Sequence, residues 1–185
     1  MSPVVETPQK KATPSQKKAT ELSEVAKTTR DAALDLARSK LPPIKQDQEL
    51  EALFQQRDFL CAFKHGLVES TCHVIGDYDA KALESYYFEP CTNPDAQSGE
   101  DIPIDGTLNI ILVVVSKTAG LEAFINSLDR ALTKALKELP WPLLDSYDSV
   151  LNVIPVTAED IEKGKGYATL LSSVHAPALK VWECA

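Results

Sequence analysis

The chain has 185 residues, of which 44% are apolar and 25% are charged, and its formal net charge is −8. These proportions are typical of a globular protein with one domain, since domains commonly contain about 100–150 residues. No run of about 18 or more apolar residues occurs, which excludes a membrane-spanning helix. The first residues lack the apolar core of a secretory signal, so we expect the protein in the cytoplasm or the nucleus.

Charge is distributed unevenly along the chain. Residues 1–45 carry nine basic and five acidic side chains, whereas the remaining 140 residues carry ten basic and 22 acidic ones. Because phosphate binding needs a basic surface, the acidic part is expected to repel nucleic acids and anionic membranes. The sequence therefore predicts no membrane partner, and a nucleic-acid partner only through the amino-terminal segment.

Residues 1–20 are predicted to be a disordered basic tail. The sequence QKKAT occurs twice in this segment, at 9–13 and 16–20, and three prolines interrupt it. With no aromatic residue before Phe54, the tail cannot bury enough apolar surface to offset the entropy of ordering it. Its Lys-Lys pairs are consistent with a nuclear-import signal, a weak contact with an anionic surface, or a solubilising tail without a partner.

A helix with a thin apolar stripe is predicted within residues 21–45, and two consecutive prolines end it. Its large apolar side chains are only Leu22, Val25 and Leu36, with alanines between them. Because such a helix is marginal alone, we expect these three side chains to bind a protein partner or a second copy of the chain. On this hypothesis, Leu22→Asp with Leu36→Asp weakens association and leaves the melting temperature nearly unchanged.

Residues 46–185 are predicted to form a globular body. A long helix begins after Asp47 and ends near Gly76, a shorter helix covers residues 80–87, and a surface loop covers 91–106. The rest of the body alternates strands with helices. Strands are predicted at 108–115, 150–156 and 179–184, and helices begin at Thr118 and at Thr157, the second with a capping box.

These elements predict an α+β or α/β fold, in which amino-terminal helices precede a β-α-β-α-β unit. If the three strands form one sheet covered by helices, right-handed crossovers make them parallel. An antiparallel arrangement in an α+β fold stays open. Parallel sheets bind ligands beyond the carboxyl ends of their strands, so a site is expected at that end.

Polar residues follow the first two predicted strands at this end of the sheet. Lys117 and Thr118 follow the first strand, and Thr157 and Asp160 follow the second. These residues are candidates for binding a ligand. The alternative is ordinary capping, in which the threonines accept hydrogen bonds from helix-terminal amides and the charged residues face water.

A turn with two glycines lies close to these residues in the sequence. Lys163, Gly164, Lys165 and Gly166 follow a strand and enter a helix, a context in which backbone amides bind phosphate. Over about six residues the turn resembles the pyrophosphate-binding turn of the acetyl-CoA-dependent N-acetyltransferases. Both glycines match that pattern, but Ile161 stands where the family has Arg or Gln. The resemblance implies an anion or nucleotide site at this turn.

The cysteines and histidines do not form a recognisable metal or catalytic motif. The four cysteines are Cys61, Cys72, Cys91 and Cys184, and none forms a C-x-x-C pair, so we expect reduced thiols. Cys61 and His65 have the spacing of two zinc ligands on a helix, but the sequence indicates no further ligands. We therefore predict that Cys61 and Cys72 are buried in the core and that no metal is bound. A cysteine with His175 as its base would be a catalytic pair, yet no activated-thiol turn flanks either residue.

No G-x-S-x-G, H-E-x-x-H or G-x-x-x-x-G-K-[ST] motif occurs in the sequence. The sequence therefore predicts a non-catalytic adaptor or assembly subunit, which binds a protein partner or forms a homo-oligomer and needs no cofactor. The alternative is a small enzyme or ligand-binding protein with an anion site at the strand ends and the Gly164-Lys165-Gly166 turn.

Overall fold

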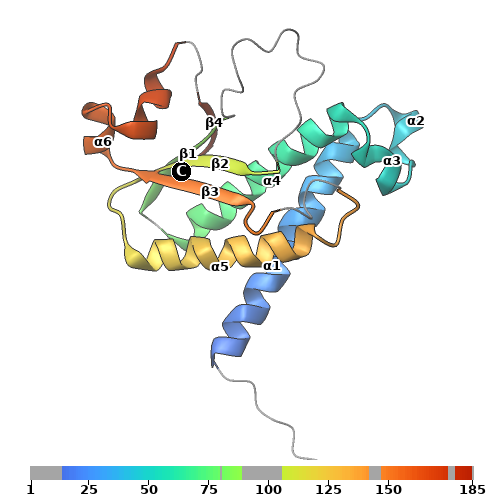
Figure 1. Ribbon diagram of the computed structural model, residues 1–185, viewed down its shortest axis with the longest axis horizontal. Coiled ribbons are helices and arrows are strands. Elements are labelled where there is room, and N and C mark those ends of the chain that lie inside the picture. The colour runs from blue at the N-terminus through green and yellow to red at the C-terminus, as the bar shows by residue number, and fades with distance from the viewer. Residues whose placement is uncertain (1–13, 80, 89–105, 142–146, 175–177, 185) are drawn as a thin grey trace, which may run out of the picture.

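The computed structural model describes residues 14–79, 81–88, 106–141, 147–174 and 178–184, without the side chains of residues 14–19. A four-stranded mixed sheet lies between a large layer of helices on one face and short helices on the other (Figure 1). Its strands, in the order β3-β2-β1-β4, are β1 (Ala82–Tyr87), β2 (Leu108–Val114), β3 (Leu151–Val156) and β4 (Leu179–Glu183). β2 is parallel to β3, whereas β1 is antiparallel to both β2 and β4.

β2 is the interior strand on which both apolar clusters of the protein meet. All seven of its residues are buried, as the continuous apolar sequence predicts. On one face, Leu108, Ile110, Leu112 and Val114 join the main core, and on the other, Ile111 and Val113 join a smaller cluster. The sheet therefore needs apolar cover on both sides of β2.

The unit that joins β2 to β3 agrees with the sequence prediction. Helix α5 (Ala119–Leu136) begins at Thr118, whose side chain accepts a hydrogen bond from the Leu121 amide at 3.2 Å. Asp129 on α5 accepts hydrogen bonds from the amides of Val150 and Leu151, at 2.9 and 2.8 Å. These bonds hold the beginning of β3 against the helix.

The sheet differs from the sequence prediction at β1 and in its number of strands. Residues 82–87 form β1 and not the predicted helix. β1 pairs with a strand on each side, so its backbone amides and carbonyls have hydrogen-bond partners in both neighbours. Tyr86 and Tyr87 are also residues that favour strands. The final strand, β4, lies beside β1. The sheet thus has four strands and not the predicted three, with β1 between β2 and β4. The predicted loop at 91–106 lies almost wholly outside the described residues.

The edge strands carry residues that do not favour further strand pairing. β3 has a neighbour only on its β2 side and contains Pro155, which has no N–H. β4 has a neighbour only on its β1 side, and Lys180 lies 2.7 Å from both Glu84 and Glu183. Both edge strands therefore contain residues that are typical of strands without a second neighbour.

Two short helices lie on the face of the sheet opposite the main helical layer (Figure 1), and the second of them covers the small cluster with Ala168, Leu170 and Leu171. They are α6 (Ala158–Glu162) and the 3₁₀ helix η2 (Gly166–Ser172). The sequence predicted one helix from Thr157 to about residue 174. Gly164 and Gly166 break it because both have a positive φ, +54° and +52°, which a continuous α-helix does not contain.

The predicted helix at residues 47–76 is divided into shorter ones. α2 (Pro43–Gln46) ends at Asp47, which is a C-cap and not the expected N-cap, and α3 (Leu50–Phe54) precedes α4 (Arg57–Tyr78). The bend after α3 places the Phe54 ring 5.3 Å from the rings of Phe59 and Phe63 and 6.0 Å from that of Trp141. Burial of these aromatic rings against one another favours the bend over a straight rod.

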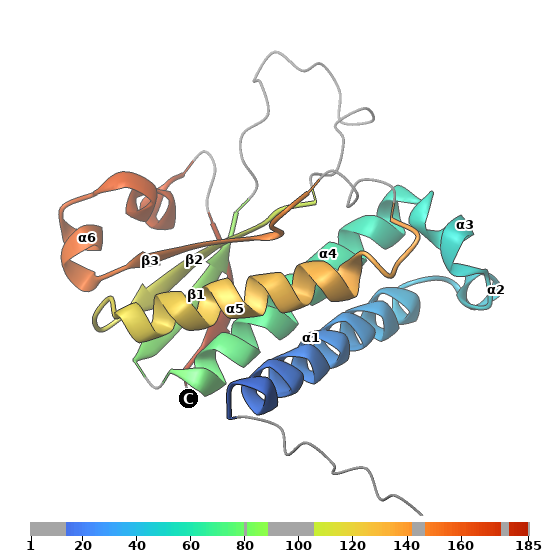
Figure 2. The same cartoon turned by 60° about the horizontal axis from the view of Figure 1, so that its bottom comes forward.

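Helix α1 (Pro14–Ser39) packs on α4 and α5, on the side away from the sheet (Figure 2). It begins at Pro14, so residues 14–20 are helical where the sequence predicted a disordered tail; residues 1–13 lie outside the described part. Its alanine stripe is fully buried in the main core. Close approach is possible because Gly66 of α4 faces it: a Cβ on Gly66 would lie 3.2 Å from the Cα of Ala33.

The three large apolar side chains of α1 face the body of the same chain. Leu22 and Val25 pack against the main core, and Leu36 is half-buried beside Gly66. Arg30 adds polar contacts with the end of α5, at 3.1 Å from the Ala135 carbonyl and 2.6 Å from Glu138. The sequence predicts an external partner for Leu22, Val25 and Leu36. They contact the core instead, because thin stripes of small residues also suit close helix packing within one chain.

Substitution of Gly66 tests this close approach. We expect Gly66→Val to lower the free energy of unfolding by about 1–3 kcal/mol, because the added atoms overpack the contact between α1 and α4. Gly120→Val is the matched control, since a Cβ there meets no atom within 4 Å. Urea denaturation of the two variants would measure the difference, and equal stabilities would contradict the packing described here.

The structure also reverses the effect expected for the double substitution on α1. Because Leu22 and Leu36 pack against the body, we now expect Leu22→Asp with Leu36→Asp to destabilise the isolated protein by about 2 kcal/mol or more. Ala32→Asp, at an exposed position of the same helix, is the control and should have little effect. A melting temperature unchanged by the double substitution would show that α1 is dispensable for the core.

Candidate functional site

The carboxyl ends of the parallel strands β2 and β3 lie side by side, as the sequence predicts for the residues that follow them. Lys117, just beyond β2, forms an ion pair with Asp160 on α6, with Nζ and Oδ2 2.9 Å apart. Thr157 and Asp160 form the predicted capping box, in which each side chain bonds the other residue's backbone amide. Thr118 caps α5. The structure thus brings these four candidates together, mainly in capping roles.

The Asp160 carboxylate is the most strongly perturbed acid at this end. Its contact with Lys117, followed by the hydrogen bond from the Thr157 amide, lowers its pKa from 3.8 to about 2. Two of the lysines nearby are also neutralised, because Lys117 pairs with Asp160, and Lys163 pairs with Glu159. These two pairs reduce the positive charge that could attract an anion to the turn.

The turn at Lys163, Gly164, Lys165 and Gly166 ends α6. The Gly164 amide donates to the Ile161 carbonyl at 3.1 Å, and the Lys165 amide donates to the Asp160 carbonyl at 2.9 Å. This is the pattern of a Schellman motif, with Gly164 in the left-handed conformation that it requires. Both amides are therefore used within the chain. A pyrophosphate-binding turn, in contrast, aims free amides at its ligand.

Exposed apolar side chains at this end were not foreseen from the sequence. Tyr78, Leu83 and Val115 have exposed fractions of 54%, 40% and 64%. Tyr78 ends α4, Leu83 is the second residue of β1, and Val115 follows β2, where its amide donates to the Lys81 carbonyl at 2.9 Å. We define these three residues, together with Lys81 and Lys117, as the strand-end surface.

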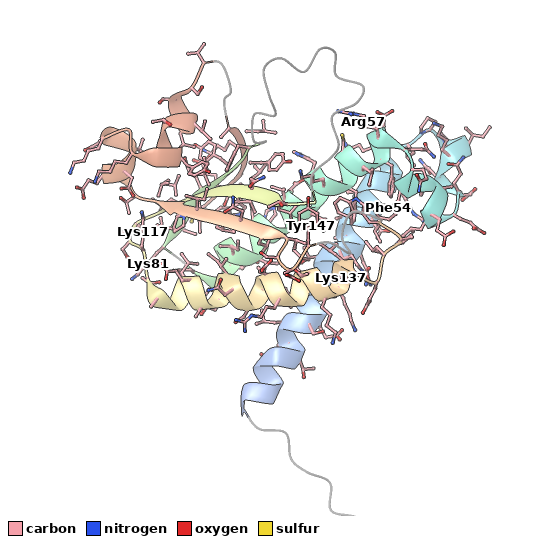
Figure 3. All side chains as sticks on the ribbon, in the orientation of Figure 1. Phe54, Arg57, Lys81, Lys117, Lys137 and Tyr147 are labelled. Carbon is pink, nitrogen blue, oxygen red and sulfur yellow. The ribbon has the colours of Figure 1, made fainter. Side chains whose placement is uncertain are left out.

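One residue of the strand-end surface, Tyr78, stacks on an aromatic ring of α5. The Tyr78 ring lies parallel to the ring of Phe124 on α5, with centroids 3.6 Å apart. Figure 3 shows Lys81 and Lys117 at this same end of the molecule, beside the beginning of α5. The surface thus combines three exposed apolar groups with two lysines, of which Lys117 is paired with Asp160. Exposed apolar groups that gather in one place mark interaction sites more often than isolated ones do.

Polar side chains inside the body have structural roles. Asn109, 4% exposed within the otherwise apolar β2, accepts a hydrogen bond from the Asn152 amide of β3 at 2.8 Å. The Nδ2 of Asn109 has no acceptor. Lys64, 3% exposed, places its Nζ 5.8 Å from the centroid of the Tyr87 ring. The burial of Asn109 could not be predicted from the apolar run of β2, and that of Lys64 could not be predicted from the helical pattern of α4.

The cysteine prediction is correct for Cys72 and wrong for Cys61. Cys72 is buried, and desolvation raises the pKa of its thiol to about 12. Cys61 is exposed, because the apolar cover along α4 does not extend over its position. Within the described residues, no group of three His, Cys, Asp or Glu side chains could hold a metal ion. Cys91 and His175 lie outside the part of the chain that is described.

Comparisons of the chain with family models, curated proteins and solved structures found no match. No helix in the described ranges is both long and apolar enough to cross a membrane. The residues and their geometry therefore supply the whole basis for proposing a function.

The acid dependence of stability tests the Asp160 contacts. Because its pKa is lower in the folded protein, Asp160 stabilises the fold above about pH 4 and loses this contribution as pH falls toward 2. We expect the stability difference between the wild type and Asp160→Asn to be largest at neutral pH and to shrink as the pH falls through about 2. Glu162→Gln, on the same short helix, is the control. A difference that does not change with pH, measured by urea denaturation, would contradict the ionic role.

Proposed function

We propose that the protein is a non-catalytic adaptor or assembly subunit in the cytoplasm or nucleus that binds a protein partner through its strand-end surface. The observation that carries this proposal is the exposure of Tyr78, Leu83 and Val115 at one end of the molecule. Burying such side chains in an interface contributes favourable free energy to binding, and aromatic residues are common at the centres of interfaces. Lys81 adds a cation at the rim, where charge influences the choice of partner.

The alternative, a small enzyme or ligand-binding protein with an anion site, receives less support from the geometry. The amides of Gly164 and Lys165 bond within the chain, and Lys117 and Lys163 are paired with carboxylates. Thermal-shift measurements with nucleotides, coenzyme A and divalent metals would test it. Stabilisation by several degrees with one of them would favour the alternative, since a ligand of the native state raises stability.

Substitution of Val115 tests the adaptor proposal. The tagged protein is purified from its native cells, a stoichiometric partner is identified, and its affinity for purified wild type and variants is measured by calorimetry. We expect Val115→Asp to weaken binding by about tenfold or more, because a charge replaces an apolar contact. Its melting temperature should be nearly unchanged, because Val115 is exposed.

Ile44→Asp is the matched control, since Ile44 is 89% exposed on α2, far from the strand ends (Figure 1). It should bind the partner as the wild type does. Equal affinities of all three proteins, or the absence of a stoichiometric partner, would reject the strand-end surface as the binding site.

A further inference from the structure

The outer face of α1 carries an acidic stripe. Glu21, Glu24, Asp31 and Asp35 are all exposed, and their spacing places them on the side of the helix opposite the buried alanines. Glu24 lies 3.6 Å from Lys27, and Asp31 is bonded to Arg30. Among the described residues, Glu21 and Asp35 have no cation within ion-pairing distance. The stripe therefore retains a net negative charge.

The outer face of α5 carries a cationic stripe. Arg130, Lys134 and Lys137 are exposed at positions separated by four and three residues, so they lie on one face. The carboxylates nearest in sequence are used elsewhere: Asp129 accepts from the amides that begin β3, and Glu138 pairs with Arg30. No other described carboxylate pairs with the three cations, which leaves their charge uncompensated.

Among the described residues, no side chain of the acidic stripe pairs with one of the cationic stripe within one molecule. α1 and α5 pack beside each other on the side away from the sheet (Figure 2). The buried faces of both helices contribute to the main core, so the acidic and cationic stripes on the opposite faces point outward. In Figure 3, Lys137 lies at the end of α5 remote from Lys117. The cationic stripe is therefore a separate feature from the strand-end surface.

We infer that two copies of the chain associate through these stripes, with α1 of each copy against α5 of the other. A twofold axis between the outer faces produces this arrangement and uses each pairing twice, as in an isologous dimer. An acidic partner would satisfy only α5, and a basic partner would satisfy only α1. A second copy supplies both charges, and this match favours it as the occupant.

Screening decides the conditions under which this dimer forms. Two chains of net charge −8 repel each other at long range. At an ionic strength of about 0.15 M, interactions between exposed charges beyond roughly 8 Å are screened, whereas contacts between the stripes persist. The dimer is expected at this salt concentration and weakens at about 0.5 M, where screening reaches nearer pairs. The inference does not depend on the proposed function, because the strand-end surface is not used.

Charge reversal with complementation tests the dimer. Sedimentation equilibrium is measured on the full chain at about 0.15 M NaCl for the wild type, Glu21→Lys with Asp35→Lys, and Arg130→Glu with Lys134→Glu. We expect each double variant to dissociate at least about tenfold more readily than the wild type, because attraction becomes repulsion at exposed pairs. An equimolar mixture of the two variants should form a heterodimer, since their charges are again opposite.

Lys40→Glu with Lys165→Glu is the control, because both residues are exposed outside the stripes and the change in charge equals that of the α5 variant. It should dimerise as the wild type does, and so should Val115→Asp, the variant of the strand-end surface. Circular dichroism verifies that each variant is folded. A monomeric wild type, a dimer unaffected by either stripe variant, or a mixture that fails to associate would each overturn the inference.

Discussion

Burial of β2 on both faces is the constraint on which the rest of the fold depends. All seven of its residues are removed from solvent, and a strand of this kind is unstable unless each face of the sheet is covered. The main helical layer covers one face through α4 and α5. The other face is covered near β2 and β3 by η2, whose Ala168 belongs to the small cluster and whose Leu170 and Leu171 pack against it. The position of η2 follows from this requirement.

Small side chains determine how the outermost helix joins the body. α1 has few large apolar groups, and it packs through Ala26, Ala33 and Ala37, all fully buried, against a helix that presents Gly66. Close backbone approach increases dispersion contacts and compensates for the small apolar area of each residue. Arg30 reinforces the contact at the end of α5, where a cation also interacts favourably with the helix dipole. α1 is thus part of the fold, and only its outer face remains available for association.

Sequence reasoning succeeded where the signal was local. The apolar run of β2, the caps at Thr118 and Thr157, and the strand at residues 151–156 each depend on a few neighbouring residues. β1 was missed because a six-residue segment with mixed apolar and polar positions fits either a helix or a strand until its partners are known. Cys61 and Cys72 occupy nearly the same face of α4, yet only one is buried. Helical periodicity does not show where the covering layer ends.

The candidate site was predictable in part for the same reason. The sequence located Lys117 and Asp160 at neighbouring strand ends, because parallel pairing of β2 and β3 follows from the helix between them. It did not show that the turn after α6 uses its amides internally, since this depends on the backbone conformation of Gly164. The exposure of Tyr78, Leu83 and Val115 depends on four elements that end or begin together, which no single segment encodes.

The two edge strands do not favour pairing with a further strand, and this has a consequence for the protein at high concentration. Proline in β3 and the charged side chains of β4 interrupt the row of amides and carbonyls that a fibril needs for growth by strand addition. The most β-prone segment of the chain, β2, is enclosed between two neighbouring strands. Amyloid formation therefore requires the sheet to open first, so resistance to it should follow the global stability of the fold.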